Sequence, residues 1–414
     1  MAACRRVSAR ILSSLAPLAP RQQIRRLSLH EYQSQNLLEN HGVPVPSGKV
    51  VRTAQDARKA VEELGGKCII SPQILHSLQK NASTTPISVD TPDQGHQTAS
   101  KILDSRPNGS QRPPVQQIYV SQALEPAEEW SLAMTIDREN YYPVILVSKT
   151  KGTEVDSEVT SFPFAISQGI TPELLSRVSD HVTRDSPPSQ PSTESLAKIL
   201  NGLFKIFTDK DGTNLEITRL ARTATDGSFT CLSTAFTFDD AAAKRQPDLF
   251  ALRDVSQDVP EEIEAAQYGI VYVRMDGNIG NVVNGAGLAM ATNDAIGLYG
   301  GRSANFLDAG GQATKETMLK AFGIIMRDER VRTIFVNIYG GKYIVCITDG
   351  RMIAESIIGA ATELGPIKVP VVVRLQGTNS IEGLKLLDEA KLGIHVEADF
   401  GEAAKMAVRF AAGQ

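Results

Sequence analysis

A repeated strand, loop and helix unit is the feature that most limits how this chain folds. From Tyr268 onward, short apolar runs are each followed by a loop rich in Gly and Asn and then by a stretch with helical periodicity. The apolar runs are residues 270–274, 303–307, 333–338 and 369–374. This alternation predicts a parallel sheet with helices on both faces. Ligands of such open sheets bind at the carboxyl ends of the strands, which is where these loops fall.

The densest of these loops is the run from Asp276 to Thr292, which places many Gly and Asn residues around one helix start. Glycine lets backbone amides approach a ligand closely, and a helix N-terminus supplies unpaired N–H groups with partial positive charge. The run therefore suits a carboxylate or a phosphate. Tight turns alone also need such glycines, so a single loop of this kind carries little weight.

The first thirty residues differ from the rest of the chain, because arginines alternate with Ser, Ala and Leu and the first acidic residue is Glu31. This composition is typical of a mitochondrial presequence, and we expect a leader over residues 1–28 and a location in the matrix. A disordered basic tail is the alternative. The arginines are Arg5, Arg6, Arg10, Arg21, Arg25 and Arg26.

The overall composition is that of an ordinary globular protein, with 42% hydrophobic and 22% charged residues among 414. This length suggests two or three domains. The formal net charge of −4 comes without any basic block, and no apolar run approaches about 20 residues, so we expect neither nucleic acid nor a membrane as a partner. The four cysteines are scattered without the pairing of a zinc site.

The amino-terminal half has a mixed pattern. We expect a helix over residues 30–41 and short strands near residues 49–52 and 69–70. Two polar, proline-containing stretches, 81–117 and 183–193, lack convincing periodicity and are predicted to be loops or partly disordered insertions. A charged connector over residues 241–264 then separates a domain at 29–255 from one at 264–414.

Taken together, the carboxyl-terminal loops closely resemble the succinate–CoA ligase β-subunit family. The similarity extends back to Glu31–Ser34, so it covers essentially the whole chain after the leader. It implies an α/β protein with an ATP-grasp domain, degenerate in its site residues, followed by a flavodoxin-like, parallel-sheet CoA-ligase domain. The motifs that carry the resemblance are residues 276–292, 300–301, 304–308, 310–311, 337–341 and 373–379.

The resemblance implies an acid–thiol ligase that joins succinate or a related small dicarboxylate to CoA with ATP or GTP and Mg²⁺. Its partner would be an α-type subunit in a heterodimer, which carries the CoA site and the phosphorylated histidine. Asn284 and the backbone around Gly341 would hold the acid, and the helix opening at Gly310–Gly311 would face the phosphohistidine. Two departures stand out: Asn281 replaces the usual cysteine, and Lys342 with Tyr343 follows Gly341.

The amino-terminal half departs further from the family at its nucleotide site. No phosphate cradle is visible, and serine and threonine hydroxyls are poor replacements for the oxygen ligands that Mg²⁺ prefers. Glu129 is a residual nucleotide-contacting residue, and we expect no metal ligands. The departures are Ser71 at the lysine position, His76–Gln79 at the glycine-rich loop, and Thr218, Arg219 and Ser233 around the two magnesium positions.

Three hypotheses stay open from the residues. The chain is an active ligase subunit, a pseudoenzyme that binds an α-type subunit without Mg-ATP, or a subunit that moves phosphate or CoA without ATP. Family membership favours the first, whereas the missing ligands favour the other two, because phosphoryl transfer relies on the metal to neutralise phosphate oxygens. Arg219 and Lys151 are candidate cations that could hold phosphate directly. The identities of the acid and of the nucleotide are not fixed by these residues.

Overall fold

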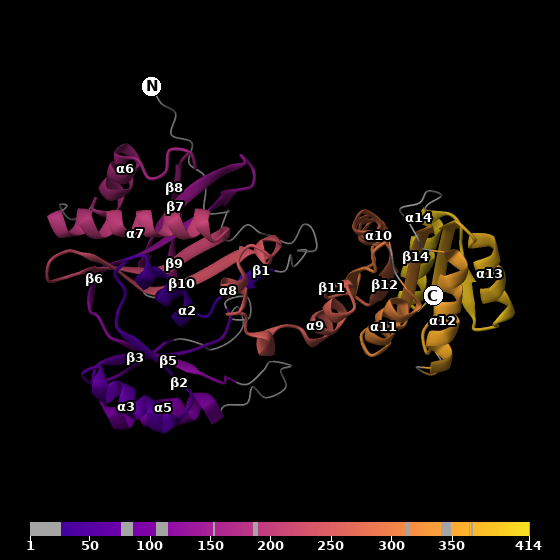
Figure 1. Cartoon of the computed structure of the whole chain (residues 1–414), viewed down its shortest axis with the longest axis horizontal. Helices are drawn as coiled ribbons and strands as arrows, with labels where there is room; N and C mark the ends of the chain where they lie inside the picture. The colour runs from indigo at the N-terminus through magenta and orange to yellow at the C-terminus, as the bar shows by residue number, and fades with distance from the viewer. Residues whose placement is uncertain are drawn as a thin grey trace. The chain divides into compact units, whose positions relative to one another are not determined.

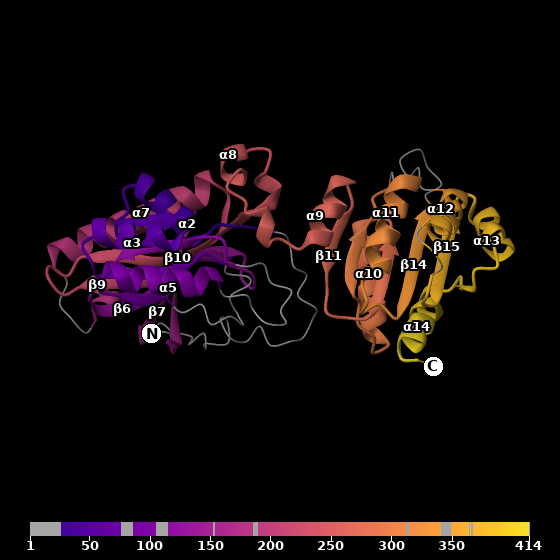
Figure 2. The ribbon, with the colours of Figure 1, turned by 90° about the horizontal axis from the view of Figure 1, so that it is seen from below.

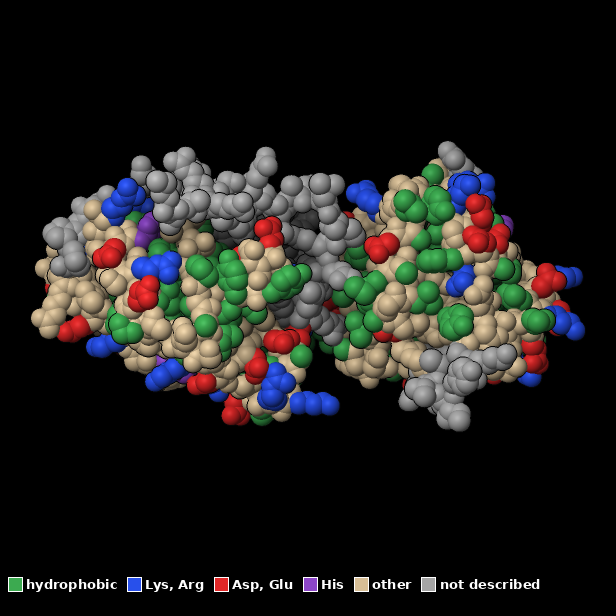
Figure 3. Space-filling view, turned by 90° about the horizontal axis from the view of Figure 1, so that it is seen from above, with side chains coloured by type: hydrophobic (Ala, Val, Ile, Leu, Met, Phe, Trp, Pro, Cys, Tyr) green, Lys and Arg blue, Asp and Glu red, His purple; other side chains and the backbone are tan. Residues whose placement is uncertain are grey.

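The computed structural model describes residues 26–75, 86–104, 115–151, 154–184, 189–311, 314–340, 349–363, 365 and 367–413. The chain divides into two compact units between Gln257 and Asp258, and each is described here by itself (Figure 1). In these described ranges, no helix is long and apolar enough to cross a membrane. On the face of each unit seen in Figure 3, basic and acidic side chains are interspersed.

The amino-terminal unit is built on a large antiparallel sheet of six strands. Its spatial order is β1-β10-β9-β6-β7-β8, so β9 and β6 lie at its centre. A bulge interrupts the pairing of β9 with β10 near Ser233 and that of β9 with β6 near Ser131. The strands are β1 (Arg26–Ser28), β6 (Pro126–Asp137), β7 (Tyr142–Lys151), β8 (Glu154–Pro163), β9 (Gly212–Thr223) and β10 (Phe229–Asp239).

Four helices contribute to the core of this large sheet: α2 (Glu31–Asn40), α6 (Pro172–Val182), α7 (Gln190–Asp209) and the short α8 (Pro247–Phe250). The longest, α7, begins where the Ser189 side chain accepts a hydrogen bond from the Ser192 amide, a stabilising N-cap. Its buried residues recur every three or four positions, so one apolar face packs on the sheet. They include Leu196, Ile199, Leu200, Leu203, Ile206 and Phe207.

A second, smaller antiparallel sheet completes the unit, with the order β2-β5-β3-β4. Two helices, α3 (Ala54–Glu63) and α5 (Pro92–Asp104), pack against each other and against this sheet (Figure 1). The expected helix at 30–41 and the expected strands near 49–52 and 69–70 are therefore confirmed. The strands are β2 (Gly48–Val51), β3 (Cys68–Pro72), β4 (Ile87–Val89) and β5 (Ile118–Gln122).

The prediction that residues 81–117 form a loop was wrong for the part that the structure describes. This stretch contains β4 and α5, and α5 buries two small residues, Gly95 and Ala99. A β-carbon at Gly95 would lie 2.8 Å from Cγ2 of Val61, so α5 packs closely on α3 without large apolar side chains. The second polar stretch is also shorter than expected, because α7 begins at Gln190.

The first strand of the large sheet overlaps the end of the expected leader. Arg26–Ser28 pair with Thr237–Asp239 of β10, and Leu27 is 1% exposed. A leader that ended at residue 28 would take this strand with it. The folded domain therefore includes residues from Arg26 onward.

The carboxyl-terminal unit contains a parallel sheet of four strands in the order β12-β14-β15-β16, as the sequence predicts (Figure 2). Helices α10 and α14 supply the core on one face, around Phe335 of the central strand. Helices α11, α12 and α13 supply the core on the other face, around Ile334 and Val336. The elements are β12 (Ile279–Val283), α10 (Ala286–Leu298), α11 (Lys315–Met326), β14 (Thr333–Gly340), α12 (Gly350–Glu363), β15 (Val371–Gly377), α13 (Ser380–Glu389), β16 (Ile394–Val396) and α14 (Phe400–Ala411).

Two of the four predicted strands of this unit, 270–274 and 303–307, do not join the parallel sheet, so that part of the prediction was wrong. They are β11 (Val271–Arg274) and β13 (Asn305–Asp308), which pair antiparallel in a separate two-stranded sheet. The sheet strand is instead β12, inside the run that we interpreted as a loop. Gly280 fits there because a β-carbon would lie 2.5 Å from Cγ2 of Ile325 on α11.

The connector between the two domains is not extended chain throughout. It contains two 3-10 turns, η1 (Asp240–Ala242) and η2 (Val255–Gln257), and the short helix α8 (Pro247–Phe250). Helix α9 (Pro260–Gln267) then opens the carboxyl-terminal unit, and Ala265 from α9 joins its core.

Candidate functional site

The loop after β12 is fastened to the end of β14 by the side chain of Asn284. Its Oδ1 accepts a hydrogen bond from the Tyr339 amide at 2.9 Å, and its Nδ2 donates to the Tyr339 carbonyl at 2.9 Å. Asn284 is 6% exposed, so both bonds are largely shielded from water. The residue predicted to hold the acid therefore also fixes the edge of the sheet at which a ligand would bind.

A carboxylate joins this loop to the next one. Oδ1 of Asp308, the last residue of β13, accepts hydrogen bonds from the amides of Gly285 at 2.6 Å and of Gly310 at 2.7 Å. Such charge-assisted bonds to backbone amides are among the stronger ones in proteins. The loops that contain Asn284 and Gly310 are thereby brought together, and Asp308 is the residue that the sequence analysis did not single out.

The loops after β14 and β15 also meet. Gly377 has a φ of +97°, and a β-carbon there would lie 1.6 Å from the carbonyl oxygen of Gly340. Only glycine allows this approach. The carboxyl ends of these two strands and the Asn284 loop thus form one continuous edge. Gly341, Lys342 and Tyr343 lie outside the described residues.

The helix expected to open at Gly310–Gly311 begins four residues later than Gly311. α11 starts at Lys315 and is capped by Thr314, whose side chain accepts a hydrogen bond from the Thr317 amide. Gly310 and Gly311 belong to the preceding turn. The predicted phosphohistidine-facing helix is therefore corrected to start at Lys315.

Behind this edge, polar side chains connect β14 and β15. Arg374 donates to Oδ1 of Asn337 at 3.0 Å and to Oε1 of Gln376 at 2.6 Å, and Asn337 donates to the Thr292 hydroxyl at 2.9 Å. Burial lowers the pKa of the Arg374 guanidinium below its usual value, although the charge of Asp399 opposes this shift. The sequence motif contained Arg374, but nothing in its spacing pointed to this network.

Asn281, which replaces the cysteine usual in the family, is 1% exposed and is held by other asparagines. Its Nδ2 donates to Oδ1 of Asn293 at 3.0 Å, and its backbone is paired in both directions with the side chain of Asn305. The replacement therefore places a polar side chain among the residues that support the sheet edge. It does not itself reach the exposed rim.

The amino-terminal unit places Glu129 and Arg219 together, from the two central strands of the large sheet. Nε and one terminal nitrogen of Arg219 donate to the two carboxylate oxygens of Glu129, with Nε at 3.3 Å. Glu129 is 10% exposed and Arg219 31% exposed. Both carboxylate oxygens of Glu129, the predicted nucleotide contact, are thus hydrogen-bonded to Arg219.

A second carboxylate, that of Glu31 on α2, lies beside this pair. Burial raises the pKa of Glu31, and hydrogen bonds with Ser233, Gln73 and Ser71, together with the charge of Arg219, oppose the shift. Ser233 also pairs in register with Arg219 across β10 and β9. Three of the positions that depart from the family, Ser71, Arg219 and Ser233, therefore gather around Glu31.

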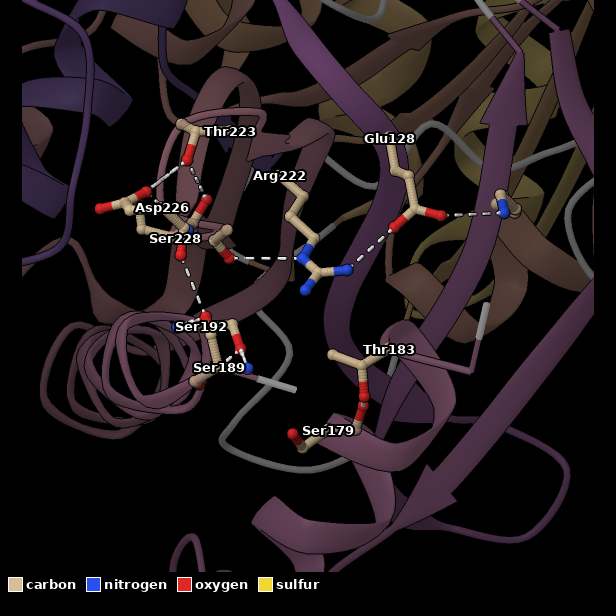
Figure 4. Close-up of polar contacts among 11 residues, drawn as sticks. Glu128, Ser179, Thr183, Ser189, Ser192, Arg222, Thr223, Asp226 and Ser228 are labelled. Atoms are coloured by element: carbon tan, nitrogen blue, oxygen red, sulfur yellow. Dashed lines mark hydrogen bonds and ion pairs between the residues drawn. The ribbon is translucent and has the colours of Figure 1, made fainter. Parts of the chain in front are cut away.

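A neighbouring ion pair lies one residue earlier on β6. Glu128 accepts a hydrogen bond from Arg222 at 3.4 Å and forms an ion pair with Lys149 of β7 at 3.5 Å (Figure 4). Arg222 also donates to the Gly227 carbonyl at 3.4 Å. Figure 4 draws this pair with Ser179 of α6, Thr183 at the carboxyl end of α6 and Ser189 before α7, the helices that cover one face of the sheet.

The side chains around Arg219 and Glu129, where the family resemblance places the nucleotide site, do not match the oxygen ligands that Mg²⁺ prefers. In the part of the chain that the structure describes, no three His, Cys, Asp or Glu side chains gather closely enough to hold a metal. Mg²⁺ needs oxygen ligands in a near-octahedral set, and Arg219 brings a positive charge to this place. His76–Gln79 and the side chain of Lys151 lie outside the described residues, so the structure does not test the predicted absence of a phosphate cradle or the phosphate role of Lys151.

Comparisons with known proteins agree with this architecture. The family model described as ATP-grasp domain matches residues 28–222, and the one described as CoA-ligase matches residues 282–408. The ATP citrate lyase from Methanothrix soehngenii, solved in complex with citrate and coenzyme A, has a similar fold, with a TM-score of 0.64 at 15% identity over 93% of this chain and 100% of its own.

Whole-chain relatives are closer in sequence. The mitochondrial ADP-forming succinate–CoA ligase β subunit of Solanum lycopersicum is 35% identical over 96% of this chain and 97% of its own length. The mitochondrial GDP-forming β subunit of Dictyostelium discoideum is 33% identical over 93% and 94%, and the ADP-forming β subunit of the bacterium Nitratiruptor is 34% identical over 94% and 100%. This chain belongs to the succinate–CoA ligase β-subunit family.

Proposed function

We propose that this chain is the β-type subunit of an acid–CoA ligase, working with an α-type subunit on succinate or a related small carboxylate. The observation that carries the proposal is the sheet edge of the carboxyl-terminal unit, where Asn284 and Asp308 fasten three strand-end loops to one another. Backbone amides and the N-termini of α10 and α11 provide positive potential for an anionic substrate. Relatives named as β subunits over nearly the whole length support it.

In this proposal the chain's own residues bind and orient the acid. Asn284 holds Tyr339, and Asp308 holds Gly285 and Gly310, so the edge is rigid before the acid arrives. Rigid positioning of reactants is a large part of what an enzyme contributes to a reaction between two bound groups. The α-type subunit would bring CoA and the phosphohistidine, as the family resemblance implies.

The test is to purify the chain together with an α-type subunit and to measure acyl-CoA formation from succinate with ATP or GTP. We expect a stable complex that protects the sheet edge from hydrogen exchange when succinate is added. As a control for a change outside the sheet edge, the complex with Asp294→Ala, which removes an exposed acid on α10, should behave like wild type. A complex that forms but neither binds succinate nor makes acyl-CoA would contradict the proposal.

A second candidate function is favoured by the contact between Arg219 and Glu129. In it the chain pairs with an α-type subunit and supports or regulates it, but does not use Mg-ATP, because the residues at the nucleotide site are paired with each other. Calorimetric titration of the complex with ADP and ATP in the presence of Mg²⁺ distinguishes the two candidates. Saturable, magnesium-dependent binding supports the ligase, and a stable complex without such binding supports the second candidate.

We also propose that the chain acts in the mitochondrial matrix. Support comes from the arginine-rich composition of the first 26 residues and from the relatives that are named mitochondrial, although bacterial relatives match as well. Because β1 begins at Arg26, we expect any processing to leave this strand in place. A fluorescent fusion with and without residues 1–25, followed by sequencing of the mature amino terminus, tests both points.

A further inference from the structure

Two ion pairs lie next to each other on the central strands β6 and β9, and they differ in what surrounds them. Glu128 pairs with Arg222, and Glu129 pairs with Arg219. Neighbouring residues of a strand point to opposite faces of a sheet, so the two pairs occupy opposite faces. Trp130 confirms the assignment, because it shares the face of Glu128 and contacts His181 of α6.

The surroundings of the Glu128–Arg222 pair indicate a structural role. Arg222 is 9% exposed, is directly opposite Glu128 across the two strands, and is further held by a backbone carbonyl. Lys149 adds a second cation to the same carboxylate and lies over the Trp130 ring. This face is covered by α6 and α7, as Figure 4 shows.

The Glu129–Arg219 pair lies in a different environment, because a second carboxylate, that of Glu31 on α2, lies beside it. Glu31 is held by hydrogen bonds from the side chains of Ser71 in β3, Gln73 just after β3 and Ser233 in β10. The strand register is irregular on both sides of Arg219, and such bulges redirect side chains at sites where several elements meet. Two carboxylates from different elements therefore lie beside one guanidinium.

The charges decide what can occupy the centre of this site. Two carboxylates in a partly buried place repel each other and need a cation between them or a bound proton. Here the guanidinium of Arg219 meets that need from within the chain, and its fork matches Glu129 through two nitrogens. A divalent metal would have to displace a guanidinium that is covalently attached and already hydrogen-bonded.

We propose that the Arg219 guanidinium is the permanent cation of this site, holding Glu129 and the adjacent Glu31 in the place of a divalent metal. The amino-terminal unit therefore keeps its arrangement with neither metal nor nucleotide bound. This inference rests on family membership and on the ion pair, and it deepens the second candidate function. Metal binding by the chain is measured without catalysis, so its failure is distinct from a failure of the ligase proposal.

The test is a set of variants of the full chain, titrated with Mn²⁺ followed by electron paramagnetic resonance, and then with Mg²⁺-ADP. We expect wild type and Arg219→Lys to bind no Mn²⁺ here, because each keeps the cation. Ser233→Asp alone should also bind none, since the new carboxylate would pair with Arg219 across the strands. The double variant Arg219→Met with Ser233→Asp should bind Mn²⁺ at least about tenfold more tightly than wild type.

The matched control is Arg222→Met combined with Ser233→Asp, which removes an arginine from the neighbouring pair on the same strands. It should gain no Mn²⁺ binding. Trp130 fluorescence checks that each variant is folded, because this residue follows Glu129 on β6 and is 4% exposed. The double variant should also unfold at a higher temperature when Mn²⁺ is added, since a ligand of the folded state stabilises it.

Two results would overturn the proposal. The first is a wild-type chain that binds Mn²⁺ or Mg²⁺-ADP at this site as tightly as the double variant, or whose unfolding temperature rises with millimolar Mg²⁺-ADP. The second is a folded double variant that binds Mn²⁺ no better than the Arg222→Met control. The wild-type measurement decides the matter even where a variant does not fold.

Discussion

The loops at the carboxyl edge of the parallel sheet and the Glu129–Arg219 cluster on the large antiparallel sheet both hold polar groups away from water, by different means. The loops use side chains to fix backbone amides: Asn284 holds Tyr339, and Asp308 holds Gly285 and Gly310. In the cluster, the hydrogen-bonding groups of one side chain pair with those of another side chain. The first arrangement leaves an edge that can accept a ligand, whereas the second satisfies its charges internally.

This difference teaches that a fold and its chemistry are maintained by separate sets of residues. The large sheet keeps a continuous apolar core around Leu132, Ile217 and Phe236, all almost fully buried. The positions that depart from the family, Ser71, Arg219 and Ser233, lie outside that core cluster. Substitution there changes what the site can bind while the sheet still forms, because burial of apolar surface supplies most of the stability.

The largest effect that sharpens this comparison is expected from Arg219→Met. Removing the guanidinium leaves Glu129, 10% exposed, without its partner, and breaking a buried pair in this way costs about 3 kcal/mol. Urea unfolding followed by the fluorescence of Trp130, the single tryptophan of the sequence, reports on the amino-terminal unit. Arg219→Lys keeps a cation and should lose less. A stability for Arg219→Met equal to that of wild type would mean that the pair contributes nothing to the unit.

A somewhat smaller effect is expected from Asp308→Ala, in the other unit. The substitution removes two charge-assisted bonds to backbone amides, which together contribute about 2 kcal/mol or more. The amides of Gly285 and Gly310 should exchange with solvent much faster, while the Trp130 transition stays in place. Asp294→Ala on the exposed side of α10 is the matched control. Unchanged exchange at both glycines would show that Asp308 does not join the loops in solution.

Asn284→Ala should cost less, about 1 to 2 kcal/mol, because it breaks two neutral hydrogen bonds to Tyr339. If the acid binds at this edge, the variant complex should also lose affinity for succinate. Asn278→Ala, a change just before β12 that removes one long hydrogen bond of 3.4 Å to the Ala411 carbonyl, should leave both quantities near wild type. Wild-type succinate binding by the folded Asn284→Ala complex would separate the structural role of this residue from substrate binding.

The sequence was sufficient for the family, for the order of the two domains and for the parallel sheet with its ligand edge. These features depend on local patterns, namely apolar runs followed by Gly and Asn, that recur within one segment. β12 was missed because its five buried residues include Gly280 and Asn281, which read as a loop. α5 was missed because its buried face is made of small residues, so that no apolar periodicity is visible.

The contacts at the two sites could not be read from sequence for a different reason. Arg219 and Glu129 are separated by 90 positions in the chain, and only the pairing of β9 with β6 brings them together. Glu31 reaches them from a helix nearly 100 residues earlier than Glu129, and its neighbours Ser71 and Ser233 come from two different sheets. The residue types alone predicted that the magnesium ligands are missing, but not that Arg219 would pair with Glu129.

The smallest predicted effect concerns the proton on Glu31 and tests whether this carboxyl belongs to the cluster. Its pKa in the folded chain is raised above the ordinary value of 4.5, mainly by burial. A raised pKa means that the folded state binds the proton more tightly, so the associated stability is complete below pH 4.5 and is lost as pH rises through the folded value. Glu31→Gln stays neutral and should not lose it.

The unfolding midpoint of Glu31→Gln, measured by Trp130 fluorescence, should therefore rise relative to wild type as the pH increases above 4.5, and the difference should level off once Glu31 is fully ionised. Glu39→Gln, an exposed glutamate on the same helix, controls for the loss of one charge. In the Arg219→Met background the difference should grow, because the arginine no longer opposes the raised pKa. A constant difference across this pH range would place Glu31 outside the charge balance of the cluster and leave Arg219 paired with Glu129 alone.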